Sequence, residues 1–129
     1  MASETRTKLI DISKQLMMAK GYNATTVEEI CKAAEVTKGA FFHYFKTKES
    51  LGISVLEDYW QERQQQFAES NWQDATHPVE HITGFLNVVA DVFMRDPNGY
   101  TCLAGSFTQE LASVNPTFRD AVAELFTQW

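Results

Sequence analysis

Hydrophobic residues recur at three- and four-residue spacing along most of the chain, which is the pattern of amphipathic helices. The first such segment covers 4–20, where Leu9, Ile12 and Leu16 share one face and Gly21 follows as a stop signal. No strand-like alternation and no internal repeat accompany this pattern. The sequence therefore predicts an all-α fold.

Two short helices with a tight connection are predicted next. The segment Thr26-Val27-Glu28-Glu29 has the form of a capping box and opens a helix that ends near Glu35. Thr37 is the expected N-cap of a third helix, with Phe41 in the core. Two short helices joined by a tight turn are typical of a helix-turn-helix unit.

Four further helices are predicted after this unit. A long one starts at about Lys48 and continues past Arg63, and a polar loop is expected over 70–76. Pro78 suits the first turn of a fifth helix, which ends before the turn residues Asp96-Pro97-Asn98-Gly99. The apolar positions of that fifth helix are Val79, Ile82, Leu86, Val89 and Phe93.

A sixth helix is expected over 102–112, and Asn115-Pro116 caps a seventh. The seventh helix reaches Trp129 with apolar residues and without Gly, Pro or a basic residue to close it. On this pattern the chain looks cut short at its C-terminus.

Composition excludes several classes of protein. Of the 129 residues, 44% are hydrophobic and 22% charged, with six Gly and three Pro, which excludes a disordered or fibrous chain. The sequence has neither a membrane-spanning run nor a signal-peptide pattern, so a cytoplasmic protein without membrane association is expected. Two cysteines form no disulfide framework and no multi-cysteine zinc site.

The net charge of -6 conceals an asymmetry between the two parts of the chain. Residues 1–50 hold eight Lys/Arg and six Asp/Glu, whereas residues 51–129 hold three and eleven. From Val36 to Lys48 there is no acidic residue, although Lys38, Lys46 and Lys48 lie in that stretch. The basic region therefore coincides with the helix-turn-helix candidate, and this favours nucleic acid as its partner.

Residues 25–51, TTVEEICKAAEVTKGAFFHYFKTKESL, resemble the DNA-binding domain of the tetracycline-repressor (TetR) family. The resemblance extends over about residues 5–51 and includes Gly21-Tyr22 after the first helix. It implies an N-terminal three-helix helix-turn-helix DNA-binding domain over 1–48. Residues 49–129 would then be part of an all-helical ligand-binding and dimerisation domain, incomplete at its C-terminus.

What the resemblance implies about function is a TetR-type transcriptional regulator. Its partners would be double-stranded operator DNA, a small-molecule effector and, in the intact protein, a second copy forming a homodimer. In the family mechanism, effector binding swings the fourth helix, and the repressor leaves its operator. No enzymatic activity, cofactor or metal is expected.

The family motif also assigns DNA contacts to individual residues. The start of the third helix faces base edges in the major groove, the aromatic stretch after it approaches the sugar-phosphate backbone, and the start of the fourth helix supplies a basic phosphate contact. At Gly39, the glycine either permits close approach to DNA or is merely tolerated in the helix. The implied residues are Thr25, Thr26, Thr37, Lys38, Gly39, Ala40, Phe42, His43, Tyr44 and Lys48.

The predicted fourth to seventh helices are rich in aromatic residues, which suits either an ordinary core or an apolar effector cavity. The resemblance favours a cavity for at least some of them. Its candidate lining residues are Tyr59, Trp60, Phe85, Phe93, Cys102 and Phe107.

Cys102 carries a second possible chemistry. The segment GYTCLAG over 99–105, followed by Gln109-Glu110-Leu111, is similar to a segment of some family members, a subset of which sense oxidants or electrophiles through cysteine. At the start of a helix, the dipole would favour the reactive thiolate; a buried inert thiol is the alternative. A redox-sensing regulator switched through Cys102, and a helical interaction module without DNA affinity, therefore remain beside the effector-released repressor.

Overall fold

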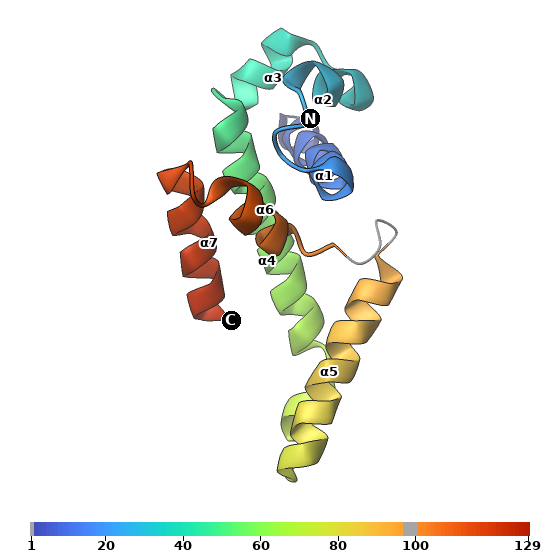
Figure 1. The fold of residues 1–129 in the computed structure, drawn as a ribbon. Helices are drawn as coiled ribbons and strands as arrows, with labels where there is room; N and C mark the ends of the chain where they lie inside the picture. Colours follow the sequence, from blue (N-terminus) through green and yellow to red (C-terminus); the bar gives the residue numbers. More distant parts are fainter. Residues whose placement is uncertain (1, 97–100) are drawn as a thin grey trace.

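The computed structural model of the chain describes residues 2–96 and 101–129 (Figure 1). Its elements are α1 (Ala2–Lys20), α2 (Val27–Ala34), α3 (Lys38–Tyr44), α4 (Lys48–Ala68), the 3-10 helix η1 (Asn71–Asp74), α5 (Pro78–Arg95), α6 (Leu103–Leu111) and α7 (Pro116–Gln128). The described residues contain no strand, so the prediction of an all-α fold is confirmed. The predicted turn over Pro97–Gly99 lies outside the described residues.

Threonine caps set the starts of the helix-turn-helix elements. The hydroxyl of Thr26 accepts the Glu29 N–H at 3.2 Å, and that of Thr37 accepts the Ala40 N–H at 3.1 Å. The full capping box predicted at Thr26 is wrong, because the Glu29 carboxylate is paired with Lys20 instead of with the N-cap backbone. Its N-cap half is present and is sufficient to begin α2.

A reciprocal capping box begins α4 instead. Ser50 donates its N–H to the Thr47 hydroxyl at 3.0 Å, and the Thr47 N–H is donated to the Ser50 hydroxyl at 3.3 Å. The α4 helix then runs from the helix-turn-helix end of the molecule toward α5 (Figure 1). It packs against α1 on one side and against α6 and α7 as well, so it joins the two parts of the chain.

One hydrophobic core connects α1–α4 with α6 and α7. Burial of each large apolar side chain contributes about 1.5–3 kcal/mol relative to exposure. Fully buried members are Leu9, Met17, Ile30, Phe41, Leu51, Val55, Leu103, Phe107 and Phe118.

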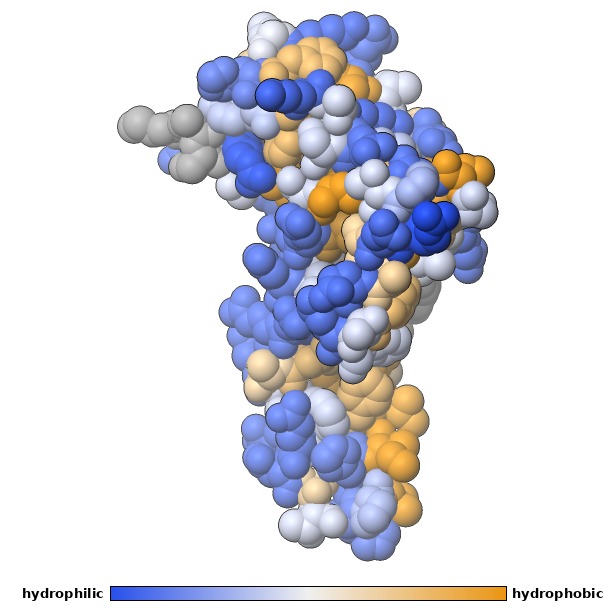
Figure 2. All heavy atoms as spheres, turned by 90° about the vertical axis from the view of Figure 1, so that its left-hand side faces the viewer, coloured by the Kyte–Doolittle hydropathy of each residue, from blue (hydrophilic) through white to orange (hydrophobic). Residues whose placement is uncertain are grey.

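Part of the apolar face of α5 is exposed. Val79 is 63% exposed, Ile82 61% and Leu86 58%, and no described side chain of α5 is buried. Within the described residues, α5 packs mainly against η1 and α4. Hydrophobic side chains accordingly gather at the lower end of the molecule (Figure 2). The regular spacing predicted the helix, and these three of its apolar positions lie at the surface.

The sequence predicted a loop over 70–76, and this prediction is corrected because the segment contains the 3-10 helix η1. Trp72 explains this short helix: its ring lies 5.1 Å from the ring of Phe85, and its indole N–H is donated to the Phe67 carbonyl at 3.3 Å. These aromatic contacts order a segment whose polar composition predicted a loop.

Candidate nucleic-acid interface

The start of α3 projects from the core at the end of the molecule farthest from the outer part of α5 (Figure 1). Phe41 anchors the helix because its side chain is fully buried, whereas Thr37, Lys38 and Gly39 are exposed. Ala40 is half-buried beside them. The burial of one side of this short helix thus leaves its first turn accessible to a large, flat partner.

Lys38 is held by a residue of α2. Its ammonium donates a hydrogen bond to the Glu28 carboxylate at 2.8 Å, and both side chains are largely exposed. This hydrogen bond raises the pKa of Lys38 and lowers that of Glu28, so both groups are charged at neutral pH. Because the pair is in water, its exchange for a contact to a base edge or phosphate is electrostatically inexpensive.

The aromatic stretch that follows also lies at the surface. Phe42 is 48% exposed, His43 is exposed and Tyr44 is half-buried. The rings of Phe41 and Phe42 are 5.1 Å apart, and those of His43 and Tyr44 are 5.0 Å apart, in edge-on arrangements. These contacts limit the ring orientations without burying the polar atoms.

Lys48 begins α4 beside this surface. Its ammonium lies 4.2 Å from the ring centroid of Tyr22, within the range of a cation–π contact. Partial burial lowers the pKa of Lys48, while the charge of Glu110 acts in the opposite direction. The aromatic ring therefore restrains a long side chain that would otherwise be mobile.

The two threonines at the start of α2 differ. Thr26 is exposed, and its hydroxyl oxygen serves as the N-cap. Thr25 is fully buried and donates its hydroxyl to the Gly21 carbonyl at 2.8 Å. In this structure the Thr25 hydroxyl therefore closes the turn between α1 and α2, and of the two side chains only that of Thr26 lies at the surface.

An apolar cavity of about 70 Å³ lies among α4, α5, α6 and α7. It is lined by four of the six candidates for effector contact, Tyr59, Trp60, Phe93 and Cys102. Phe85 lies elsewhere, on an open groove of about 540 Å³ that also includes Trp60. Phe107 does not line either of these two spaces; it is fully buried, and its ring packs against Tyr22 and Phe118.

Cys102 is the N-cap of α6. Its Sγ accepts the Gly105 N–H at 3.4 Å and the Tyr59 hydroxyl at 3.6 Å. Burial raises the pKa of Tyr59 to about 12, so this hydroxyl stays protonated and keeps its hydrogen to donate. Cys31, by contrast, is buried, and burial raises the pKa of its thiol. The Cys102 sulfur is partly exposed and accepts two hydrogen bonds, whereas the Cys31 thiol is buried.

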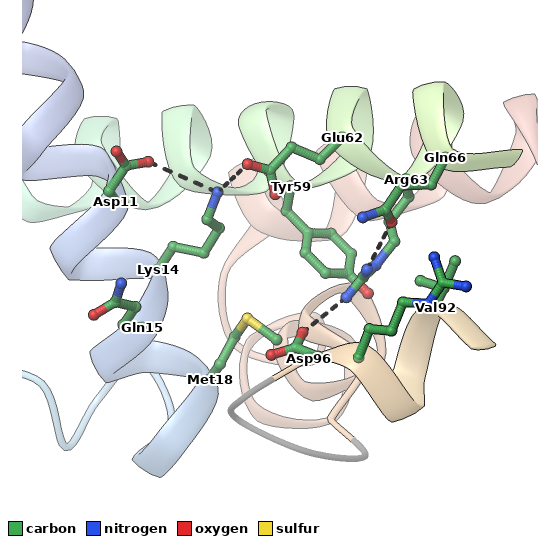
Figure 3. A pocket seen from close by; sticks show the side chains of 11 residues that line it. Asp11, Lys14, Gln15, Met18, Tyr59, Glu62, Arg63, Gln66, Val92 and Asp96 are labelled. Carbon is green, nitrogen blue, oxygen red and sulfur yellow. Dashed lines mark hydrogen bonds and ion pairs between the residues drawn. The ribbon is translucent and has the colours of Figure 1, made fainter. Parts of the chain in front are cut away.

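A charged cleft of about 370 Å³ lies where α1, α4 and the end of α5 meet (Figure 3). Lys14 donates to Asp58 and Glu62 there, and Arg63 donates to Asp96 at 3.0 Å. Arg63 is 7% exposed. These ion pairs could not be predicted from the sequence, because their members lie far apart in the chain and form no local motif.

Comparison with known proteins was made for the sequence and the fold. The family model described as bacterial regulatory proteins, tetR family, matches residues 9–55. The HTH-type transcriptional repressor DhaR of Mycobacterium sp. (strain GP1) is 27% identical over 124 residues, 96% of this chain and 61% of that protein. The HTH-type transcriptional repressor NemR of Escherichia coli (strain K12) is 26% identical over 119 residues, 92% of this chain and 60% of that protein.

A solved structure agrees with these matches. A TetR transcriptional regulator from Chloroflexus aurantiacus J-10-FL has a TM-score of 0.85 and 25% sequence identity, over 99% of this chain and 64% of that one. The fold of this chain and its exposed helix α3 define its class of protein. It is a helix-turn-helix protein with an all-helical second part. The chain is similar to the tetR family of bacterial regulatory proteins, through the family model over residues 9–55 and through the relatives and the solved structure over nearly its whole length.

The chain spans 58–61% of the length of the curated relatives DhaR, AcuR and NemR. All three are named as transcriptional regulators or repressors, which agrees with the prediction that the chain is not an enzyme. Over residues 2–96 and 101–129, no helix has the length and hydropathy to cross a bilayer. The same residues contain no group of three or more His, Cys, Asp or Glu placed to hold a metal ion.

Proposed function

We propose that this chain carries the operator-binding domain, and part of the effector-binding domain, of a transcriptional repressor. The intact protein binds double-stranded operator DNA as a homodimer in the cytoplasm, and a small-molecule effector releases it. The observation that carries the proposal is the exposed first turn of α3, where Thr37, Lys38 and Gly39 lie clear of the core. A recognition helix uses these first residues to contact base edges in the major groove.

Phosphate contacts would fix this helix on the duplex. Lys48 supplies a charge beside α3, and Thr26 supplies a hydroxyl and neighbouring N–H groups at the start of α2. The aromatic residues Phe42, His43 and Tyr44 would lie along the sugar-phosphate backbone. The charge asymmetry of the sequence agrees with this orientation, since the acidic part of the chain would point away from DNA.

An effector site is supported by the apolar cavity that Tyr59, Trp60, Phe93 and Cys102 line. Its volume of about 70 Å³ is small, so an effector that enters it must also displace surrounding side chains. Because α4 lines the cavity and also begins at Lys48, such a displacement would reach the DNA-binding surface. Release is then a difference in DNA affinity between two positions of α4.

The proposal is tested by fluorescence anisotropy with labelled duplex DNA from upstream of the protein's own coding region. The wild-type chain should bind it more tightly than random duplex DNA, and binding should weaken as salt increases. Lys48→Ala should weaken binding and reduce the salt slope by about one unit. Light scattering shows whether the chain is dimeric. If a dimeric chain binds DNA without sequence preference, the result would favour the helical interaction module instead.

A redox-sensing regulator is the second candidate, favoured by the two hydrogen bonds to Cys102 Sγ. Here oxidation of the thiol by a peroxide, which is itself reduced to water or an alcohol, would replace reversible effector binding. Hydrogen peroxide should then weaken DNA binding by the wild type. Cys102→Ser should bind DNA with the same affinity before and after peroxide treatment, and an equal response of both proteins would exclude this candidate.

A further inference from the structure

Glu110, in the last turn of α6, is hydrogen-bonded to the turn that follows α1. Its Oε2 accepts the Tyr22 N–H at 2.9 Å, and its Oε1 accepts the Asn23 N–H at 2.7 Å. Gly21 makes this approach possible, since it has a φ of 89° and a Cβ there would lie 2.8 Å from Glu110 Oε2. One carboxylate thus holds two successive backbone N–H groups, with each of its oxygens used.

The side chain of Tyr22 extends this connection to Lys48. Its ring meets Phe107 of α6 at 5.8 Å and Phe118 of α7 at 4.9 Å, both edge-on. The Lys48 ammonium lies 4.2 Å from the centroid of the same ring. The ring is therefore packed against the regulatory helices and at the same time supports the ammonium of a candidate phosphate contact.

Close packing leaves the ring little freedom to adjust. At Gly52 of α4, a Cβ would lie 2.8 Å from both Tyr22 Cε2 and Phe118 Cζ. In such a contact, a shift of α6 or α7 cannot be absorbed by small rotations of Tyr22 alone. It must be passed on to the turn, to α4, or to both.

The same helix that carries Glu110 begins at the effector cavity. Cys102 caps α6 and lines the cavity, and Glu110 follows eight residues later, about 12 Å along a helix axis. Because α6 spans only Leu103–Leu111, it moves as one short rigid unit. A displacement at its first turn therefore moves the carboxylate at its last.

We propose that Glu110 is a positioning residue for DNA binding, which fixes the turn after α1 so that the Tyr22 ring holds the Lys48 ammonium in place. The phosphate contact of Lys48 thereby depends on the position of α6. This inference rests on the proposed operator binding, and it adds the residues through which the effector-binding helices control it. Displacement of α6 withdraws Glu110 from the two N–H groups, and Lys48 loses its fixed position.

A double-mutant cycle on DNA affinity tests the proposal, with the labelled upstream duplex as the probe. Glu110→Gln and Lys48→Ala should each weaken binding by about tenfold and lower the salt slope by about one unit. The double variant should bind within about threefold of Lys48→Ala alone, because the same contact is lost in both. Losses that multiply in the double variant, or an unchanged salt slope in Glu110→Gln, would overturn the proposal.

Glu124→Gln is the matched control for charge. It also removes one carboxylate, and the Glu124 carboxylate accepts a hydrogen bond from Gln128 of its own helix at 3.0 Å. Removal of a negative charge should by itself leave DNA affinity unchanged or raise it slightly. If DNA affinity falls in Glu110→Gln but is unchanged or rises in Glu124→Gln, the effect of Glu110 is due to positioning and not to net charge. Equal changes in DNA affinity in the two variants would contradict positioning by Glu110.

A second measurement requires no DNA. In the chain labelled with ¹³C-lysine, the ε-methylene protons of Lys48 should be shifted upfield by the Tyr22 ring, and Lys48→Ala identifies their signal. Glu110→Gln should reduce that shift, and an unchanged shift would refute the positioning role. Failure of the wild type to bind DNA would refute the proposed function instead, while the NMR result still decides whether Glu110 positions Lys48.

Discussion

The Lys14 ammonium of α1 lies 2.7 Å from the Asp58 carboxylate of α4. It also lies 2.8 Å from the Glu62 carboxylate of the same helix, a contact that Figure 3 shows. The Lys14 side chain is 11% exposed. Burial opposes its charge, but its hydrogen bonds to the two carboxylates outweigh burial and raise the pKa of Lys14. An ion-paired lysine therefore links the helix-turn-helix part of the chain to the long helix that leads away from it.

Replacement of Lys14 by Met should destabilise the fold by about 1–2 kcal/mol, because two carboxylates lose their shared cation while the aliphatic stem is retained. Lys8→Met is the matched control. The Lys8 ammonium is 3.9 Å from Glu35, and both side chains are exposed, so a change below about 0.5 kcal/mol is expected. Urea unfolding of both variants measures the difference. Equal stabilities would show that the Lys14 cluster contributes no more than a surface pair.

Gly39→Ala separates the two interpretations of this glycine. A Cβ there would have Thr37 Oγ1 as its nearest neighbour at 3.8 Å, an ordinary contact, so the fold has room for a methyl group. Alanine should therefore stabilise the folded chain by about 0.5–1 kcal/mol. If Gly39 permits close approach to a base edge, DNA affinity should nevertheless fall about tenfold in anisotropy titrations. Unchanged affinity would show that the glycine is merely tolerated in α3.

The helix-turn-helix elements were predictable because their signals are local. Thr26 and Thr37 cap the helices that the sequence analysis assigned to them, and Phe41 is buried as expected. Caps act over three or four residues, and apolar spacing identifies one face of a helix. Both kinds of signal are complete within a short window of sequence.

Spacing does not tell which neighbour covers an apolar face. Val79 and Ile82 have the period of core residues but are exposed, whereas Phe107 is fully buried beside Tyr22. The contact between Glu110 and Tyr22 joins residues 88 positions apart. Such contacts depend on how α6 is placed against α1, and no local pattern encodes that placement.

Alkaline pH should destabilise the fold through its buried tyrosines. Burial raises the pKa of Tyr59 and of Tyr22 to about 12, compared with about 10 in an unfolded chain. Between pH 10 and pH 12 the folded chain therefore binds more protons than the unfolded chain. The stabilisation from these tyrosines is fully present below pH 10, and the free energy of unfolding falls as the pH rises toward 12. In Tyr59→Phe, the decrease in the free energy of unfolding between pH 10 and pH 12 should be smaller by on the order of 2 kcal/mol, as measured by urea unfolding. An unchanged slope would mean that the Tyr59 phenol ionises freely in the folded chain.

The two cysteines should differ in their rate of alkylation. Cys102 is partly exposed, and its Sγ accepts hydrogen bonds from the Gly105 N–H and the Tyr59 hydroxyl, both of which stabilise a thiolate. Cys31 is buried, and its raised thiol pKa disfavours the reactive form. Iodoacetamide at neutral pH should therefore modify Cys102 first, as peptide mapping by mass spectrometry can follow.

Tyr59→Phe gives this last prediction a sharper form. The variant removes the hydroxyl donor 3.6 Å from the sulfur and leaves the Gly105 N–H in place. Alkylation of Cys102 should then slow by about threefold to tenfold, because one hydrogen bond to the thiolate is lost. Cys31 in the same protein serves as the internal control, and its rate should not change. Faster or unchanged alkylation of Cys102 in Tyr59→Phe would show that access to the sulfur governs reactivity more than the hydrogen bonds it accepts. Equal rates for the two cysteines in the wild type would contradict the predicted order of alkylation.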